Sequence, residues 1–428
     1  MGFAQRWQEI RSGFSRPFWV ANISELFERL SYYAAFAALA NYLHERLAFS
    51  TQQTGNLTGF FGGLVWFLAA FGGAVSDRLG FRRALSTAYL ILAIAYFLMG
   101  SIGSSWLSPV RDAIPLWWVV LFILILPALG IAMVKPSVVG TTASASSENV
   151  RSIGYSIYYT LVNVGGALGP FLGSFVHEHL GVENVFRMSA ASVFVMFFAV
   201  LVFFRQPARS ADSPAPTLGQ TARNFVTVIT NLKFVLFLLI FSGFWVVYWQ
   251  TYIALPLMLR SYTDAPTIDR VIATDATMVI FFQVLISLAT RGIPAFRAIT
   301  LGTLISSFSW LIFGSRPGVW TAVLSLVVLA IGEMVLSPRY YEYVSRLAPP
   351  DQQGTYMGFA FVPIGIGSIV GGWAAGWAVH TFAEVQRQPQ RVWWFFTALG
   401  IATAAALWIY DLIVKPVMAT ETSIAKAE

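Results

Sequence analysis

Long apolar stretches separated by short polar segments run through the whole chain. Each of these stretches is long enough for a helix that crosses a bilayer. They lie at about residues 18–43, 54–76, 84–104, 115–143, 152–178, 184–204, 233–258, 271–290, 295–314, 318–346, 353–380 and 392–414. The eighth stretch is the weakest, because Asp275 and Gln283 interrupt it. The pattern predicts an all-α membrane protein with twelve transmembrane helices.

A polar segment divides this pattern after the sixth stretch. Residues 205–223 are rich in Pro and Ser, which indicates a linker. We therefore expect an N-terminal six-helix half at 1–204, a cytoplasmic linker at 205–232 and a C-terminal six-helix half at 233–428. A shift of 202 residues supports two repeated halves. It places Gly130 on Gly332, Pro136 on Pro338, Gly165 on Gly367 and Gly169 on Gly371.

Composition and charge agree with a membrane protein. Of the 428 residues, 57% are hydrophobic and only 11% are charged, whereas soluble domains carry about 25% charged residues. The net charge of +7 does not indicate nucleic acid, because the basic residues fall in short loops. With both ends inside, sixteen Lys and Arg lie on the cytoplasmic side and eight on the outer side. We therefore predict a multi-pass protein of the cell inner (plasma) membrane with both termini in the cytoplasm.

Several kinds of chemistry are disfavoured by the residue types present. The chain has no Cys, and its four His include no H-x-x-x-H pair, so we expect neither a metal site nor a cofactor. The loops carry no paired acids and no phosphate-binding Gly-Lys motif, which argues against a membrane enzyme. A substrate sensor that keeps a carrier fold without cycling is left open by the sequence.

Three charged residues interrupt the first apolar stretch. Glu28 and Arg29 lie three and four residues after Glu25, so the three side chains share one face of a helix. A charge in hydrocarbon is costly, and this face must therefore meet a partner or water. One interpretation is an Arg–Glu pair that only holds the helices together. We favour the other, a functional site, because ionisable residues within a membrane are usually functional.

Further polar residues are expected at the same depth as Glu28. Helix geometry and the predicted topology place Lys135, Asn163 and Glu333 near the middle of their own helices. Substrate sites of carriers lie at this level, between the two repeats. We predict that a zwitterion binds with its carboxylate toward Arg29 and Lys135 and its ammonium toward Glu333.

The loop between the second and third helices carries a recognisable motif. Residues 72–83 read Gly-Gly-Ala-Val-Ser-Asp-Arg-Leu-Gly-Phe-Arg-Arg. This segment resembles the signature loop of the major facilitator superfamily. Asp77 can bind a helix N-terminus or an Arg from the other half. We expect Asp77, Arg78 and Arg82 to form a latch that holds one conformation.

A narrower resemblance extends over both halves. The stretches that carry it are Glu25–Tyr33, Gly130–Pro136, Tyr155–Gly165, Gly332–Pro338 and Leu347–Pro349. Together they resemble proton-coupled oligopeptide transporters. The resemblance implies symport of protons with short peptides by alternating access. It also implies that Arg29 and Lys135 engage the carboxyl end of the peptide, and Asn163 and Glu333 its amino end.

The resemblance also suggests how a proton couples to the substrate. Our hypothesis is that Glu25 or Glu28 pairs with Lys135 until it is protonated, and that protonation frees the cations for the substrate. The alternative for Lys135 is a salt bridge with a structural role only. Aromatic residues are expected to line the cavity, with Tyr33 and Trp245 as the better candidates.

Some positions depart from the pattern of that family. Helix 7 usually carries an acid just before a Gln, but here Trp249 precedes Gln250. Asp275 stands where the family has an Asn, and it either supplies the missing acid and binds an ammonium group or lies in a wet outer mouth. The alternative function is a carrier or exporter for another small metabolite or drug. We expect a functional monomer whose partners are a small-molecule substrate, protons and lipid.

Overall fold

The computed structural model describes residues 13–147, 150–206, 219, 226, 228–347 and 353–414. In this part of the chain helices are joined by short segments, and the extended pairing is a single isolated bridge between Phe14 and Ser146. The structure therefore confirms the predicted all-α class.

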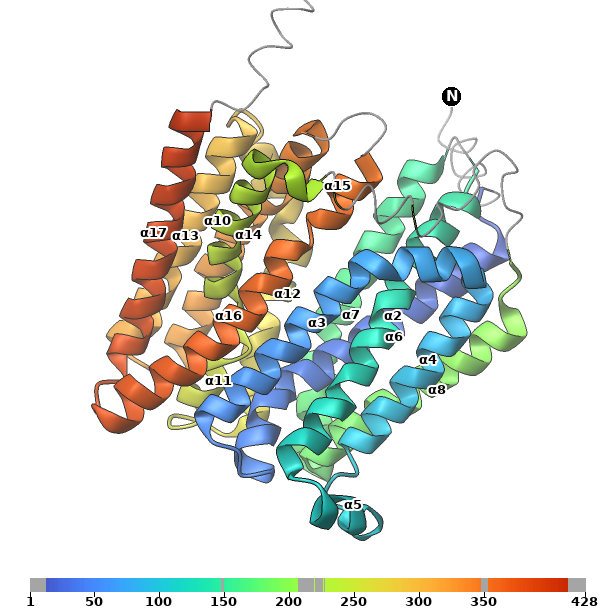
Figure 1. Cartoon of the computed structure of the whole chain (residues 1–428), viewed down its shortest axis with the longest axis horizontal. Helices are drawn as coiled ribbons and strands as arrows, with labels where there is room; N and C mark the ends of the chain where they lie inside the picture. Colours follow the sequence, from blue (N-terminus) through green and yellow to red (C-terminus); the bar gives the residue numbers. More distant parts are fainter. Residues whose placement is uncertain are drawn as a thin grey trace, which may run out of the picture. The chain divides into compact units, whose positions relative to one another are not determined.

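The helices follow the predicted apolar stretches (Figure 1). The first half of the chain contains α2 (Arg16–Asn41), α3 (Thr51–Leu79), α4 (Phe81–Met99), α5 (Ser108–Ala113), α6 (Leu116–Ser144), α7 (Arg151–Leu180) and α8 (Val182–Phe203). The second half contains α10 (Leu232–Tyr248), α11 (Ala254–Leu259), α12 (Ala265–Ala289), α13 (Ala295–Ser315), α14 (Val319–Leu347), α15 (Gln353–Phe359), α16 (Val362–Ala378) and α17 (Gln390–Val414).

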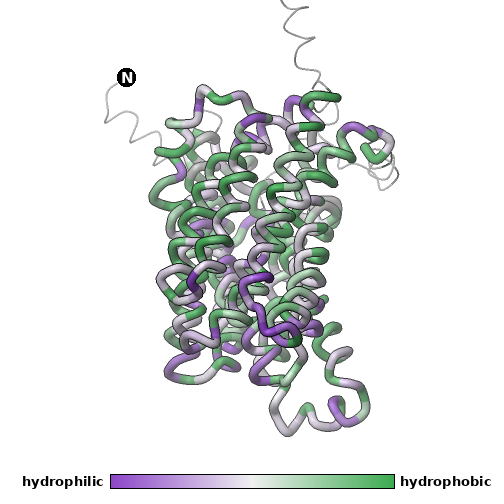
Figure 2. The backbone as a smooth tube through the Cα atoms, turned by 90° about the vertical axis from the view of Figure 1, so that its left-hand side faces the viewer, coloured by the Kyte–Doolittle hydropathy of each residue, from purple (hydrophilic) through white to green (hydrophobic). Residues whose placement is uncertain are grey.

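Within the described residues, 10 helical segments have the length and composition to cross a membrane. Helix α2 is not among them, because each of its 18-residue windows contains Glu25, Glu28 and Arg29. Hydrophobic stretches run along the helices, and the loops include very hydrophilic ones (Figure 2). The chain is therefore an integral membrane protein, and the number of twelve spans stays a prediction.

Two predicted spans are interrupted and one begins early. The seventh is divided by the 3-10 turn Trp249–Thr251, which separates α10 from α11. The eleventh breaks after Phe359, and Pro363 lies in the first turn of α16, where a missing N–H is tolerated. Helix α12 begins at Ala265 rather than near residue 271, which brings Asp269 into the helix.

The described chain forms two compact units. Unit 1 comprises Met1–Leu47, Leu64–Thr217 and Asp264–Ala276, and unit 2 comprises Ala48–Gly63, Leu218–Thr263 and Thr277–Glu428. Helices α3 and α12 each contribute one part to each unit. The predicted division into two continuous halves, 1–204 and 233–428, with a linker at 205–232 between them, stays a prediction.

In unit 1, α2 packs against α6, α7 and α8, and α4 packs against α6 and α8. The start of α2 is tied to the end of α6, because the Ser15 amide donates a 3.1 Å hydrogen bond to the Ala145 carbonyl. About two turns further along α2, the Asn22 amide donates to the Thr142 hydroxyl at 3.1 Å. These bonds fix the register between α2 and α6.

In unit 2, α13 packs against α14 and α17, and α10 packs against α16 and α17. The first part of α3 meets α16 through glycines. A Cβ atom on Gly59 would lie 2.6 Å from the Ser368 carbonyl oxygen and 2.7 Å from Gly372 Cα. The Ser368 hydroxyl donates to the Gly59 carbonyl at 3.0 Å. Small residues thus let the two backbones touch.

We predict that Gly59→Leu destabilises the protein by about 1–3 kcal/mol, the usual cost of overpacking. The measurement is thermal unfolding of the purified protein in detergent. The matched control is Gly292→Leu, because no atom lies within 4 Å of a Cβ built at Gly292. Equal melting temperatures for the two variants would contradict the close contact.

Candidate functional site

Helix α2 buries three charged side chains near its middle. Glu25 and Glu28 have no exposed surface, and Arg29 is 2% exposed. The Arg29 Nε atom lies 2.5 Å from Glu28 Oε2 and 3.6 Å from Glu25 Oε1. The predicted cluster on one helix therefore forms, with the guanidinium shared between two carboxylates.

The hydrogen bonding of this cluster is incomplete. Both carboxylate oxygens of Glu25, Oε1 of Glu28 and Nη2 of Arg29 are buried without a hydrogen-bond partner among the described residues. Two carboxylates and one guanidinium carry a net charge of −1, which is unfavourable in a buried site. The arrangement therefore favours a further positive charge, either a cation or a proton.

Lys135 of α6 supplies positive charge close by. It interacts electrostatically with Glu25, Glu28 and Arg29, and its Nζ atom lies 4.4 Å from the centre of the Trp66 ring. A cation over an aromatic face is attracted by the ring quadrupole. Arg29 forms ion pairs with both carboxylates. The expected pairing of Glu25 or Glu28 with Lys135 stays a prediction.

Glu28, Lys135 and Asn163 lie at similar depth within unit 1. Glu28 is twelve residues from the start of α2, about 18 Å, and Lys135 is nine residues from the end of α6, about 14 Å. Asn163 is twelve residues from the start of α7, again about 18 Å. Its side-chain amide donates to the Tyr159 carbonyl at 2.8 Å.

Glycines bring α7 against the charged part of α2. A Cβ on Gly165 would lie 2.6 Å from the Leu26 carbonyl oxygen and 2.9 Å from Arg29 Cβ, and one on Gly166 would lie 3.3 Å from the ring of Tyr33. This close contact places α7 beside the charged cluster and supports the Tyr33 ring.

Aromatic rings continue the site along α2. The Arg29 guanidinium carbon lies 5.1 Å from the centre of the Tyr32 ring. Tyr32 contacts Tyr33 edge to face at 5.1 Å and stacks on Phe36 at 5.5 Å. The Tyr32 ring therefore offers its face to the guanidinium, and Tyr33 and Phe36 hold that ring in place.

The predicted residues of unit 2 lie on α10 and α14. Trp245 is buried and meets Phe244 and Tyr248 edge to face, each at 5.1 Å. Trp249, at the position where the resemblance expects an acid, is buried and donates to the Ile364 carbonyl at 3.1 Å. It is a packing residue of unit 2. Glu333 lies on α14 and is half-buried.

The predicted latch is only partly described. Asp77 belongs to α3, but its side chain lies outside the described residues. Arg78 is exposed at the end of the same helix. The Arg82 guanidinium donates to the Leu201 carbonyl at 2.6 Å, in the last turn of α8, where a cation is favourable. A role of these residues as a latch stays a prediction.

The structure also shows a pair of a half-buried His and a buried Asp that the sequence did not reveal. His177 Nδ1 of α7 lies 2.9 Å from Asp269 Oδ2 of α12, and the Ser174 hydroxyl donates to the Pro266 carbonyl at 2.6 Å. Asp275, two turns further along α12, is also buried. In the described part of the chain, no three His, Asp or Glu side chains lie together as metal ligands.

Comparison with known proteins identifies the family. Residues 22–291 match the model of the Major Facilitator Superfamily, which is more than half of the chain. The protein therefore belongs to this superfamily and is a membrane transporter.

Individual relatives are more distant. The chain is 24% identical to the Multidrug resistance protein MdtH of Escherichia coli O1:K1 / APEC over 385 residues, covering 88% of this chain and 90% of the relative. The MdtH protein of Shigella boydii serotype 18 gives the same values. The sequence identity to these MdtH proteins is thus low, but the similarity extends over most of the chain.

Solved structures of peptide transporters share the fold. A POT family transporter in complex with 5-aminolevulinic acid matches with a TM-score of 0.77 and 15% identity, covering 92% of this chain and 96% of that chain. A POT family transporter in complex with a thioalcohol-conjugated peptide matches with a TM-score of 0.75 and 16% identity, over 92% and 96%. At such identities the likeness establishes the fold.

We predict that Arg29→Met lowers stability by about 3–5 kcal/mol at pH 8, because it leaves two buried carboxylates without their ion-pair partner. Acidification should recover part of this loss, since a protonated carboxyl is neutral. Thermal unfolding at pH 8 and pH 5 measures both effects. The control is Arg346→Met, which breaks the half-exposed pair with Glu342 and should cost at most about 1 kcal/mol. A loss that does not depend on pH would contradict this account.

Proposed function

We propose that the protein is a proton-coupled symporter that moves short peptides or a related zwitterion by alternating access. The observation that carries the proposal is the buried cluster of Glu25, Glu28 and Arg29 with Lys135 nearby. Charged groups in a membrane helix are costly and rare, and those that occur usually mark a substrate or ion pathway. The fold shared with POT family transporters supports the substrate class.

Charge balance gives a direct mechanism for coupling. With Lys135, the cluster contains two carboxylates and two cations, so its net charge is zero. Protonation of Glu25 or Glu28 leaves a net charge of +1, which attracts the carboxylate of a zwitterion. Because linkage is reciprocal, binding of that carboxylate also strengthens binding of the proton. Neither the proton nor the substrate then occupies the site favourably without the other.

The two ends of the substrate would be recognised by different chemistry. Arg29 offers a planar fork of donors suited to a carboxylate, and Lys135 offers a mobile point charge. We assign the ammonium group to Glu333, with Asn163 as a further hydrogen-bonding partner, on the basis of charge and the sequence resemblance. Tyr33 and Trp245 would provide aromatic walls that tolerate different side chains. Asp275 is a second acid for the ammonium group, or else a residue of the outer mouth.

A second candidate function is export of a drug or another small metabolite. The observation in its favour is the similarity to MdtH proteins, which are named for multidrug resistance. In that case the proton would move against the substrate. The charged cluster would still bind the proton, but the carboxylate-binding role of Arg29 and Lys135 would be lost.

The remaining features of the proposal concern the whole chain. We infer a monomer in the cell inner membrane with both termini in the cytoplasm. The distribution of Lys and Arg supports the orientation of the termini. Asp77, Arg78 and Arg82 would hold one conformation of the cycle. The hydrogen bond of Arg82 to the end of α8 supports a positional role for this loop.

The first test concerns coupling. In proteoliposomes with an alkaline, negative interior, Glu28→Gln should abolish uphill peptide uptake, because the amide cannot exchange a proton. Counterflow exchange of peptide without a gradient should persist. Glu384→Gln, an acid of an exposed pair with His380, serves as control and should behave as wild type. Full uphill uptake by Glu28→Gln would refute the coupling mechanism.

The second test concerns substrate class. Uptake of di- and tripeptides, amino acids, sugars and a lipophilic cation is compared in the same vesicles. Lys135→Ala and Glu333→Gln should each reduce peptide uptake at least about tenfold, the effect of losing a charge-assisted hydrogen bond of about 1.5–3 kcal/mol. Transport of the lipophilic cation that neither variant affects would favour the drug carrier instead.

A further inference from the structure

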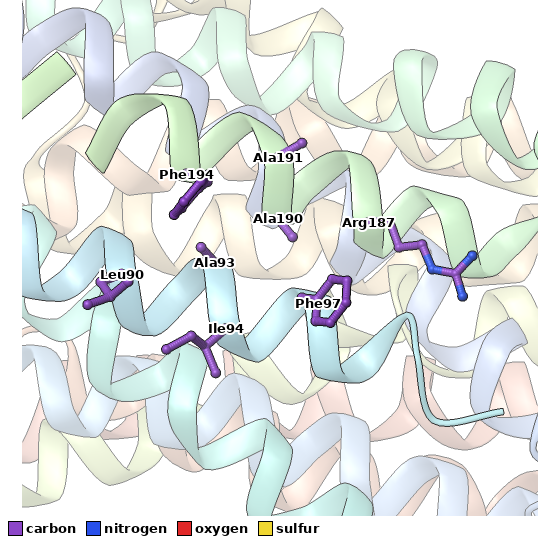
Figure 3. Close-up of a pocket in the computed structure, with 8 residues that line it drawn as sticks. All are labelled: Leu90, Ala93, Ile94, Phe97, Arg187, Ala190, Ala191 and Phe194. Atoms are coloured by element: carbon purple, nitrogen blue, oxygen red, sulfur yellow. The ribbon is translucent and has the colours of Figure 1, made fainter. Parts of the chain in front are cut away.

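Helices α4 and α8 form an apolar groove on the surface of unit 1. Figure 3 shows its lining, in which apolar side chains of both helices form a row that ends at the guanidinium of Arg187. The lining residues are Leu90, Ala93, Ile94 and Phe97 of α4, and Arg187, Ala190, Ala191 and Phe194 of α8. The cavity volume is about 450 Å³, within the roughly 300–1,000 Å³ of ligand pockets.

A second, polar cavity of about 240 Å³ adjoins this groove. Arg187 lines both cavities, so the polar one begins where the apolar one ends. The other lining residues are Arg46, Gly100, Gly103, Ser104, Glu183 and Asn184. Together the two cavities match the polarity of an amphiphile, with a larger apolar part and a smaller polar part.

The charges in the polar cavity favour an anion. Arg46 is paired with Glu183, whereas Arg187 donates a 3.1 Å hydrogen bond to the neutral Asn184 side chain and forms no salt bridge among the described residues. Two cations and one acid leave a net charge of +1. The free donors of the Arg187 guanidinium suit a phosphate oxygen.

The groove is also open to the bilayer. Ile94, Phe97 and Phe194 are each about half exposed, as expected for side chains that face lipid. Phe97 stacks on Trp106 at 6.2 Å, and an exposed Trp at a helix end is typical of the membrane interface. A lipid can therefore enter the groove from the side with its head group at the level of Arg187.

We propose that this double cavity is a specific binding site for an anionic phospholipid. One acyl chain lies in the groove between α4 and α8, and the phosphate binds Arg187 in the polar cavity. The predicted topology places this end of the helices at the outer side, so the lipid belongs to the outer leaflet. The site is separate from the charged cluster on α2 and does not depend on the transported substrate.

The test is native mass spectrometry of the full chain in detergent, titrated with phosphatidylglycerol and, separately, with phosphatidylcholine of the same acyl chains. Wild type should retain phosphatidylglycerol more strongly. Arg187→Gln should weaken it about fivefold, which corresponds to loss of one interfacial cation, and Arg187→Lys should keep the preference. Arg316→Gln, an exposed outer arginine outside the site, is the matched control. Equal binding of both lipids, unchanged by Arg187→Gln, overturns the proposal.

A second pair of variants tests the groove itself. Phe97→Ala with Phe194→Ala removes two rings of the lining, and both lipids should then bind more weakly. Phe122→Ala with Phe175→Ala is the control, because these rings are more than half exposed and lie outside the groove. Lipid binding unchanged by the first pair would place the lipid elsewhere and overturn the assignment. If the mass spectra show a dimer that the first pair of variants abolishes, a second copy of the chain occupies the groove and the lipid assignment is overturned.

Discussion

A guanidinium held between two carboxylates in the middle of an apolar helix is the interaction on which this structure depends. Arg29 cannot lose its charge, and neither Glu25 nor Glu28 reaches water. Charges of this kind are tolerated only if neighbouring helices enclose them with matching groups. The glycines of α7 and the fixed register of α6 serve this requirement, since they bring backbone and Lys135 close to the cluster.

The same cluster is poorly optimised for stability, and this is informative. Three carboxylate oxygens and one guanidinium nitrogen are buried without hydrogen bonds among the described residues. A purely structural ion pair would be more stable with those groups satisfied. In the proposed mechanism a proton would change the net charge of the cluster by one, and groups without hydrogen bonds would leave room for that change. The interpretation as a structural cluster alone also accounts for these distances, because Lys135 can balance the second acid of α2.

The sequence predicted the helices well because hydropathy decides them. Most ends lie within three residues of the predicted ones, and the largest difference is at α12, where Asp269 and Arg270 made the first turns look like a loop. Glu25, Glu28 and Arg29 could be placed on one face from spacing alone. The distances from Arg29 to the two carboxylates, and the position of Lys135 over the Trp66 ring, depend on tertiary geometry and could not be predicted from spacing.

Two other features were beyond the reach of a single sequence for the same reason. The His177–Asp269 pair joins helices far apart in the chain, and nothing in the local sequence of either residue names its partner. The groove between α4 and α8 is formed by ordinary apolar residues whose periodicity only predicts a helix facing lipid. It becomes distinct because Ala93, Ala190 and Ala191 leave space that larger residues would fill.

Trp249 sharpens the role of the cluster on α2. It occupies the place of an expected acid, and its indole is buried and hydrogen-bonded to the carbonyl of Ile364 next to the break before α16. An indole does not exchange a proton in the physiological range, so this position contributes packing and no charge. If the transporter is driven by protons, the titrating group must then be sought among the buried acids elsewhere. Glu25 and Glu28 lie beside Arg29, a cation that could bind a substrate carboxylate, so under the proposed function coupling and recognition would meet on α2.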